Sequence, residues 1–395
     1  MTVDPAFPAA PPHFALRMSA FFGGFFLIHG VALPWFPVWL QGRGLTDVEI
    51  ASVLAIPMAF RVLMAPVGGF IAGRTPRRRF AIRLFLVPAG LVFLTAWTAS
   101  TYLPLLLLTG AAFTLMQMAM PAGEALALTG ARRFGVDYGR MRLWGSVAFA
   151  AANVGSGAML GLLPIEAIFW FIFAAFVIAA MAGFVLPRTP KAVRAIDDAS
   201  RPEERPAWKV LGHPNVMAVV LASGLVLGSH AAFYSFGSIY WQSLGFSPVE
   251  IGGFWAVSIA CEVLLFAWSG ALIRRIGPYA MITIGAVAAI LRWTLLPWDL
   301  GGAGFLALQS LHALSFAAVF VGTQFIIVRA VPEEMAGSAQ SIIVLVGGLI
   351  MAGMVALSGP LYAAFGADSF RTMIVLPVMA LGVLAVQRLV YPERA

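Results

Sequence analysis

Charged side chains inside otherwise apolar sequence are the residues of this chain that could do chemistry. Glu124 lies in one apolar run and Arg142 near the start of the next, on either side of a short basic turn. An ionised group at the centre of a bilayer costs roughly 2.5 to 3.5 kcal/mol on insertion scales, so such groups tend to face a partner or a wet cavity. We therefore expect Glu124 to meet Arg142, with the ring of Phe149, two helical turns further on, along the same face. The alternative is an ion pair that only holds two helices together.

The elements that must position these residues are membrane-spanning helices. The chain has 395 residues, of which 61% are hydrophobic and 11% charged, whereas soluble domains are roughly a quarter charged. Runs of about 20 apolar residues recur along the whole length, and each is long enough to cross a bilayer as a helix. We predict an all-α membrane protein with twelve such helices, at 14–40, 48–73, 80–98, 102–129, 141–161, 165–186, 213–241, 248–273, 278–298, 302–330, 336–364 and 368–390.

The positive charges indicate how this protein is oriented. The formal net charge is +8, but all except four of the 25 Lys and Arg fall in the termini, in the loops that leave even-numbered helices, or just inside them. Basic residues concentrate on the cytoplasmic side of membrane proteins. The distribution predicts a multi-pass protein of the inner (plasma) membrane with both termini in the cytoplasm, and argues against nucleic acid as a partner.

An internal repeat divides the chain into two halves. Residues 44–74 and 245–275, a constant offset of 201, agree at ten of 31 positions. Between the halves, composition changes abruptly to a polar, proline-containing segment. We predict an N-terminal six-helix bundle at 1–186, a cytoplasmic linker at 187–212 and a C-terminal six-helix bundle at 213–395. The same alignment pairs Arg61 with Glu262, about 20 Å from the cytoplasmic end of their helices.

The stretch Gly139-Arg140-Met141-Arg142-Leu143-Trp144-Gly145, with Glu124 before it, resembles the helix 4 to helix 5 region of lactose permease-like transporters. The order of residues in this stretch is more similar still to that of the phenylpropionate permease-like members of the major facilitator superfamily. The resemblance extends over roughly residues 14–390. It implies two pseudo-symmetric bundles, a substrate site near mid-membrane between them, and transport by alternating access.

The resemblance also implies roles for single residues. Glu124 and Arg142 would contact the substrate, although Phe149 stands where lactose permeases have a tryptophan, which argues against a galactoside. Arg292 and His312 resemble residues of the proton-coupling machinery, but Ser315 replaces a carboxylate of that machinery. We predict that Glu262 carries the coupled proton, with Arg292 as its cation and His312 as a relay. The alternative is that Glu262 pairs with Arg61 as a gate.

Two histidines and several arginines complete the predicted sites. The histidines lie within helices: His29, together with Arg61, is assigned to the substrate site and His230 to proton coupling. The segment Gly69 to Arg79 resembles the basic loop between helices 2 and 3 of major facilitators, but Gly73 occupies the place of the usual Asp. Gating is assigned to Arg74, Arg77 and Arg78 and, in the second half, to Arg274 and Arg275.

The predicted function is proton-coupled symport of a small aromatic or otherwise apolar carboxylate. Three buried arginines, Arg61, Arg142 and Arg292, face only two carboxylates, and an unpaired buried cation favours an anionic ligand. No nucleotide-binding loop, metal-ligand cluster or hydrolase triad is recognisable, so neither an enzyme nor a cofactor is predicted, and a proton gradient supplies the energy. The alternatives are a sugar or nucleoside proton symporter, a drug or metabolite efflux transporter, and a membrane sensor that does not transport.

Overall fold

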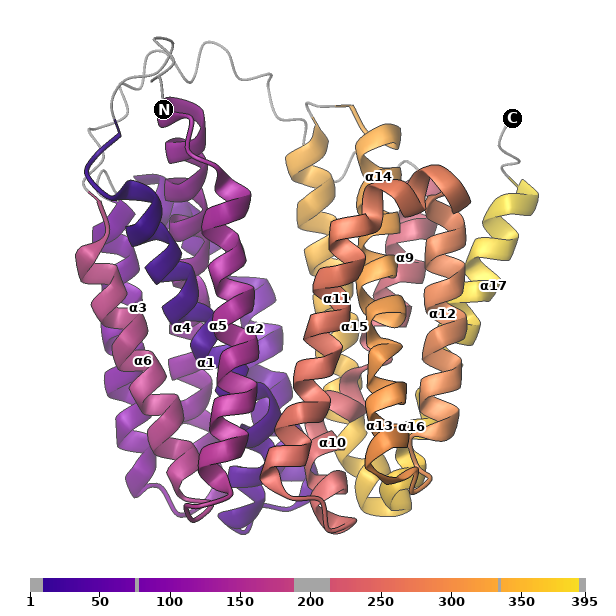
Figure 1. Cartoon of the computed structure of the whole chain (residues 1–395), viewed down its shortest axis with the longest axis horizontal. Coiled ribbons are helices and arrows are strands. Elements are labelled where there is room, and N and C mark those ends of the chain that lie inside the picture. The colour runs from indigo at the N-terminus through magenta and orange to yellow at the C-terminus, as the bar shows by residue number, and fades with distance from the viewer. Residues whose placement is uncertain (1–9, 75–77, 188–213, 333–334, 391–395) are drawn as a thin grey trace. The chain divides into compact units, whose positions relative to one another are not determined.

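The structure is a computed structural model, and it describes residues 10–74, 78–187, 214–332 and 335–390. For residues 65–74, 336 and 337 it describes the backbone alone. Within these ranges every regular element is a helix (Figure 1). The all-α prediction is therefore confirmed.

The first half of the chain is a succession of long helices joined by short connections. They are α1 (Phe14–Gly42), α2 (Asp47–Arg74), α3 (Arg78–Thr95) with the short η1 (Ala96–Thr98), α4 (Tyr102–Phe134), α5 (Tyr138–Leu160) and α6 (Ala167–Val185).

The second half repeats this pattern with more interruptions. Its helices are α9 (Pro214–Gly228), α10 (Ala231–Ser243), α11 (Pro248–Ile276), α12 (Pro278–Leu295), α13 (Gly301–Ser310), η2 (Ala313–Ala318), α14 (Val319–Ala330), α15 (Ala336–Phe365), η4 (Gly366–Asp368), α16 (Ser369–Thr372) and α17 (Val375–Val390).

The predicted apolar runs correspond to these helices. Ten stretches of the described chain are long and apolar enough to cross a membrane, and the last of them, Ser338–Val390, holds both α15 and α17. With α2 these stretches account for all twelve predicted runs. Several of the runs are made of more than one helix: α9 and α10 form a single stretch, and so do α13, η2 and α14.

The chain divides into two compact units. Unit 1 comprises Met1–Leu45 and Leu63–Ala195, and unit 2 comprises Thr46–Val62 and Ile196–Ala395. The boundaries expected at 186 and 212 remain a prediction, because residues 188–213 lie outside the described chain.

Unit 1 is organised around α1, which packs along α5 and α6, while α3 packs along α4 and α6. Glycines allow these helices to approach closely. A Cβ atom at Gly30 would lie only 2.6 Å from the carbonyl oxygen of Phe149 in α5, and one at Gly24 would lie 3.0 Å from the Cα of Ala179 in α6. Small residues at such crossings are the usual means of packing helices without a hydrophobic driving force.

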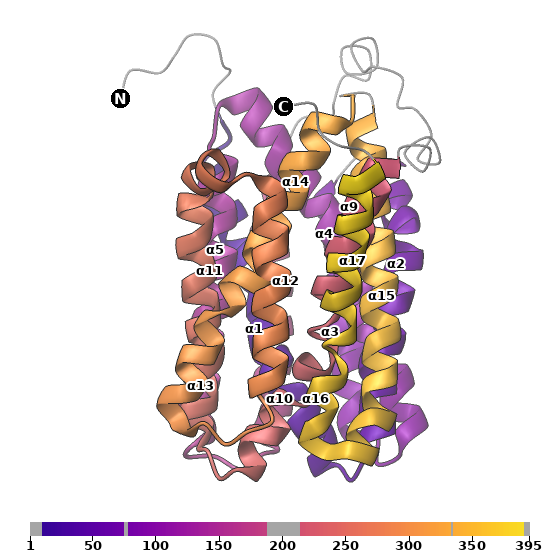
Figure 2. The same ribbon diagram turned by 90° about the vertical axis from the view of Figure 1, so that its right-hand side faces the viewer.

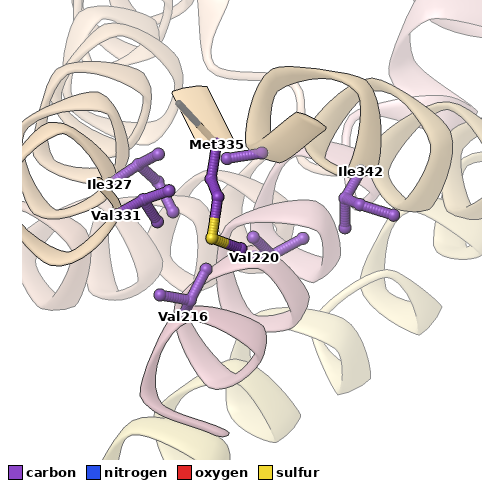
Figure 3. Close-up of a cluster of buried hydrophobic side chains, with 7 residues drawn as sticks. Val216, Val220, Ile327, Val331, Met335 and Ile342 are labelled. Atoms are coloured by element: carbon purple, nitrogen blue, oxygen red, sulfur yellow. The ribbon is translucent and has the colours of Figure 1, made fainter. Parts of the chain in front are cut away.

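Unit 2 is organised around α9, which packs against α15 and α17 (Figure 2). One end of α9 lies in a cluster of buried apolar side chains from α9, α14 and α15, in which Met335 lies near Val216 and Val220 (Figure 3). The first part of α2 belongs to this unit through its contacts, since Ala55 packs with Ala231 of α10 and Val355 of α15.

The repeat in the sequence produces the same local structure at two helix starts. Ser247 and Glu250 form a capping box at the start of α11: the side chain of each residue accepts a hydrogen bond from the backbone N–H of the other. Thr46 and Glu49, 201 residues earlier, make the same three contacts at the start of α2. The glycines two residues before each cap share a left-handed backbone conformation: Gly44 has φ 84° and Gly245 has φ 86°.

Two irregular segments interrupt the helices of unit 2. Between α9 and α10 the helix breaks at Ser229 and His230, and side chains bind the freed carbonyl groups: Ser229 Oγ donates to the oxygen of Val226 at 2.6 Å. The segment η2 is a π-helix of six residues that directly follows His312. Irregular backbone within a membrane is tolerated where its polar groups find partners, and π-helical turns often occur at functional sites.

Candidate functional site

Charged and polar side chains gather in two clusters, one in each unit. The cluster in unit 1 is built on α4 and α5, where Glu124 Oε1 lies 3.7 Å from Arg142 Nε. The two side chains are 28% and 31% exposed, so this ion pair is only half-buried. The expected meeting of Glu124 and Arg142 is confirmed. Their roles in binding a substrate remain a prediction.

Tyr138 and Gly145 define the surroundings of this pair. The hydroxyl of Tyr138 donates to Glu124 Oε2 at 2.6 Å, so both oxygens of the carboxylate have a partner. Gly145 leaves room for the guanidinium group, since a Cβ atom there would lie 2.9 Å from Arg142 Nη1. Asp137 caps α5 by accepting from the backbone N–H of Arg140, which fixes where the helix begins.

Aromatic rings from α1 cover Arg142. The guanidinium carbon lies 3.9 Å from the ring centre of Phe26 and 5.6 Å from that of Phe22. Among the described residues these are the rings that face the guanidinium group. Phe149, expected beside the ion pair, is half-buried, and its carbonyl oxygen accepts a hydrogen bond from Asn153. A signal for the two rings was present in the sequence, because Phe22 and Phe26 are four residues apart and so share a helix face.

His29 lies on the same helix, with its ring tilted against the rings of Phe25 and Phe26. Its Nδ1 is 3.3 Å from the carbonyl oxygen of Phe25 and its Nε2 is 2.8 Å from Gln117 Nε2. Because a carbonyl only accepts, Nδ1 carries the proton and Nε2 accepts from Gln117. His29 therefore bridges α1 and α4. Its assignment to the substrate site remains a prediction.

The cluster in unit 2 is buried and centres on Arg292 of α12, which is 1% exposed. Arg292 Nη1 donates to His312 Nδ1 at 3.0 Å and to Ser315 Oγ at 2.9 Å. Arg292 Nη2 donates to Gln309 Oε1 at 2.9 Å. The rings of Trp293 and Phe233 lie 4.7 Å and 5.4 Å from the guanidinium carbon. In the described part of the chain, all the hydrogen-bond acceptors of Arg292 are neutral side chains.

Glu262 of α11 joins this cluster through His312. Its Oε1 lies 3.0 Å from His312 Nε2, and the two side chains are 11% and 5% exposed. Arg292 was expected to be the direct cation of Glu262, but the structure interposes His312 between them. Arg61 lies half-buried in the part of α2 that belongs to unit 2. Among the described residues the side chain in direct contact with Glu262 is His312, rather than Arg61 as the gating alternative supposes.

His230 lies at the break between α9 and α10 and is fully buried. Its Nδ1 is 3.1 Å from the carbonyl oxygens of Val226 and Leu227, of which the second also accepts from the backbone N–H of His230. Its Nε2 is 3.0 Å from Ser315 Oγ. The polar groups therefore form one continuous chain from His230 through Ser315, Arg292 and His312 to Glu262.

The helices hold this chain in place by close packing. A Cβ atom at Gly285 of α12 would lie 2.7 Å from the carbonyl oxygen of Leu314, so the glycine lets α12 rest on the π-helical segment η2. Ser258 of α11 donates to Gln309 Oε1 at 3.1 Å and thereby orients the amide toward Arg292. Neither the break at His230 nor the π-helical turn could be predicted from the spacing of apolar residues.

The arginines assigned to gating are only partly described. Arg77 lies outside the described residues, and of Arg74 the backbone alone is described, at the end of α2. Arg78 donates to the carbonyl oxygen of Ala125 at 2.7 Å and to the hydroxyl of Thr129, which ties α3 to α4. Arg274 and Arg275 are exposed in the last turn of α11. Their gating role is not tested by these contacts and remains a prediction.

A buried carboxylate, two imidazoles and an arginine along one hydrogen-bonded chain, on the helices of a twelve-helix membrane protein, are typical of secondary transporters. The chain belongs to the MFS_1 like family of major facilitator transporters, whose model matches residues 15–372. It is thus a multi-pass membrane transporter of a small molecule and not an enzyme.

Two curated relatives narrow the range of transporters that this chain resembles. The chain is 31% identical over 372 residues to the probable 3-phenylpropionic acid transporter of Escherichia coli (strain K12), a match that covers 90% of this chain and 94% of that protein. It is 25% identical over 283 residues to the maltose permease of Geobacillus stearothermophilus, a match that covers 71% of each.

Solved structures agree on the fold. The nucleoside transporter NupG superposes with a TM-score of 0.78 at 16% identity and covers 96% of this chain and 100% of its own. A bacterial homologue of the human lysosomal transporter Spinster, in its inward-facing and occupied conformation, superposes with a TM-score of 0.77 at 14% identity, covering 97% of this chain and 98% of its own. The predicted major facilitator fold is confirmed.

Proposed function

We propose that this transporter carries a small aromatic or otherwise apolar monocarboxylate together with a proton. The observation that carries the proposal is the 31% identity over 90% of the chain to a probable 3-phenylpropionic acid transporter. The two clusters supply the chemistry that such a symport requires, an arginine near aromatic rings and a buried carboxylate that can be protonated.

The unit 1 cluster supports the choice of substrate class. Arg142 is 31% exposed and so retains an accessible surface, with Phe26 packed on one side of it. A guanidinium group binds a carboxylate through two parallel hydrogen bonds, and a ring beside it suits an aromatic body. In this proposal Arg142 binds the carboxylate, Glu124 and Tyr138 orient Arg142, and the ring of Phe149 or Phe26 packs on the ligand.

The unit 2 cluster supports proton coupling. Glu262 is the one carboxylate in its hydrogen-bonded chain, and its direct contact with His312 gives a proton a route onto a second titratable group. We assign the coupled proton to Glu262 and the relay to His312. A proton and a monocarboxylate that enter together carry no net charge, so transport is expected to be electroneutral.

Electroneutrality makes the proposal testable against its rivals. The purified protein, reconstituted in liposomes, would be given either a pH gradient or a potassium diffusion potential, with labelled 3-phenylpropionate, maltose or uridine as substrate. We expect 3-phenylpropionate to accumulate under the pH gradient and not to respond to the potential. Accumulation of maltose or uridine under both driving forces, without uptake of the carboxylate, would establish a sugar or nucleoside symporter instead.

We also propose that the protein lies in the plasma membrane with both termini in the cytoplasm, because its basic residues concentrate in the loops that leave even-numbered helices. Cys261 is the single cysteine, so Cys261→Ser provides a cysteine-free background. In intact cells a membrane-impermeant maleimide should label Asp299→Cys and spare Arg132→Cys. Labelling of Arg132→Cys alone would reverse the orientation.

A further inference from the structure

The directions of the hydrogen bonds in the unit 2 cluster follow from two groups that cannot change role. An arginine side chain only donates, and a backbone carbonyl only accepts. The cluster has Arg292 in its middle and the carbonyl oxygens of Val226 and Leu227 at one end. Every donor and acceptor between these fixed points can therefore be assigned.

Because Arg292 can only donate, its contact determines which ring nitrogen of His312 carries a proton. Arg292 Nη1 donates to His312 Nδ1, so that nitrogen carries no proton and offers its lone pair. In the neutral ring the proton then lies on Nε2, 3.0 Å from Glu262 Oε1, to which it is donated. The other polar group facing Nε2 is the hydroxyl of Tyr234, at 3.5 Å. His312 is therefore a donor toward Glu262.

The fixed acceptors give His230 the opposite state. Its Nδ1 faces two carbonyl oxygens and must carry the proton, which leaves Nε2 as an acceptor in the neutral ring. Ser315 Oγ accepts from Arg292 and lies 3.0 Å from His230 Nε2 and 3.4 Å from the carbonyl oxygen of His312, so its hydroxyl donates to the nearer acceptor, His230. The two histidines are packed edge to face, with ring centres 5.0 Å apart, and are held in opposite tautomers.

We propose that Ser315 and His230 are positioning residues that hold Arg292 on Nδ1 of His312 and so keep His312 from accepting a proton. We call this pair the latch. While Ser315 and His230 hold Arg292 in this position, the lone pair on Nδ1 of His312 is occupied by the hydrogen bond from Arg292. When Arg292 withdraws, a proton can add to Nδ1 while the Nε2 proton passes to Glu262, so that one proton enters the ring and one leaves it. The inference rests on the proposed proton coupling for its role in transport.

The latch is specific to the residues present in this chain. At position 315 the hydroxyl both accepts from Arg292 and donates to His230, whereas a carboxylate would accept from both. The proton of the Ser315 hydroxyl therefore needs an acceptor on the side away from Arg292. Nε2 of His230 is that acceptor, because the contacts at the helix break keep the proton of the ring on Nδ1. This explains why a histidine lies at the end of α9 without any contact to an acidic group among the described residues.

The test is the tautomer of each histidine in the transport-competent protein. The full chain, labelled with ¹⁵N-histidine and placed in lipid nanodiscs without substrate, would be examined by magnetic resonance, with His312→Gln and His230→Gln spectra assigning the signals. We expect the Nε2–H tautomer at His312 and the Nδ1–H tautomer at His230. The same tautomer in both rings, or a doubly protonated His312 at neutral pH, would overturn the donor order.

Substitutions at position 315 test the latch itself. Ser315→Ala should give a mixture of tautomers at His312, and should raise proton entry in the absence of substrate several-fold. Ser315→Thr keeps the hydroxyl and should retain the single tautomer. Ser310→Ala is the matched control and should change neither, because the hydroxyl of Ser310 donates to the carbonyl oxygen of Ala307 in its own helix. An unchanged His312 tautomer in Ser315→Ala would overturn the latch.

Failure of the latch and failure of the proposed function are distinguishable. The tautomers are read without substrate and without a proton gradient, whereas symport is read from accumulation. If the expected tautomers are found in a protein that does not couple protons, the donor order stands and the coupling assignment fails. If accumulation responds to pH while His312 carries its proton on Nδ1, the coupling assignment stands and the latch fails.

Discussion

The arginine of each cluster differs from the other in its exposure and in the charge of its partners. In unit 1 a carboxylate lies 3.7 Å from Arg142, and both side chains are about 30% exposed. In unit 2 Arg292 is 1% exposed, and its acceptors among the described residues are neutral, with Glu262 reached only through His312. An exposed arginine with a movable partner can exchange that partner for a ligand. A buried arginine held by several neutral acceptors can instead respond to protonation of the groups around it.

The largest expected effect concerns Glu262. Glu262→Gln still accepts from His312 but cannot be protonated, so accumulation driven by a pH gradient should fall at least about tenfold, a change of ~1.4 kcal/mol. Substrate exchange at equal pH should remain close to that of the unmodified protein. Both rates are measured in liposomes with labelled 3-phenylpropionate.

Glu250→Gln is the matched control for this prediction. Glu250 lies on the same helix, and glutamine can replace glutamate in a capping box. Accumulation by Glu262→Gln at the level of Glu250→Gln would remove Glu262 from the coupling mechanism. Loss of exchange together with accumulation would favour a structural or gating role.

The second prediction tests whether Arg142 binds the substrate. Arg142→Lys keeps the charge but loses the planar pair of donors, and charged hydrogen bonds contribute about 1.5–3 kcal/mol. The affinity for 3-phenylpropionate should fall about 10- to 100-fold, as measured by isothermal titration calorimetry. Arg140→Lys, at an exposed arginine that pairs with Asp137, should bind normally. Normal binding by Arg142→Lys would leave the ion pair a purely structural role.

A third substitution asks whether Glu124 orients Arg142. Tyr138→Phe removes the 2.6 Å hydrogen bond to Glu124 Oε2 without changing the shape of the ring. Because the group is half-buried, the loss is about 1 kcal/mol, which weakens substrate binding about fivefold. The proton-driven accumulation ratio at saturating substrate should not change. A change in that ratio with unaltered affinity would contradict the division of roles between the clusters.

The smallest expected effect is that of the ring over Arg142. Phe26→Leu keeps apolar bulk and removes a cation–π contact worth about 0.5–1 kcal/mol, so the affinity should fall about two- to fivefold. Phe80→Leu, at an exposed ring of α3, serves as the control. If Phe26→Leu binds aromatic and aliphatic carboxylates with unchanged affinity, the ring does not contribute to the site.

The sequence predicts the helices well and the clusters only in part. Apolar runs of bilayer length identify the helices because each crossing must satisfy its own backbone. The pair Glu124 and Arg142 could be predicted because the basic turn between them returns the chain to the same depth. Arg292, His312 and Glu262 could be placed in one cluster through the resemblance, but the order of contacts could not, because it depends on side-chain directions in three helices.

What the sequence does not reveal are departures from regular helix geometry. The break between α9 and α10 at Ser229 and His230 occurs without a proline or any charged residue nearby. The sequence does not single out Phe22 and Phe26 as the rings beside Arg142, because aromatic residues at helical spacing are common in packed helices. The domain boundaries, the roles of the site residues and the gating arginines remain predictions.

The π-helical segment η2 has a consequence for how this region can change over evolutionary time. A π-helical turn holds about one residue more than an α-helical turn. Deleting one residue between Ala313 and Ala318 would close the segment into an ordinary helical turn, and because the turn itself is kept, α13 with Gln309 and α14 would keep nearly the same faces. The segment is therefore a place where one residue can be gained or lost without turning the flanking helices, and such a change would alter only which side chains the turn itself, Ser315 among them, presents to Arg292.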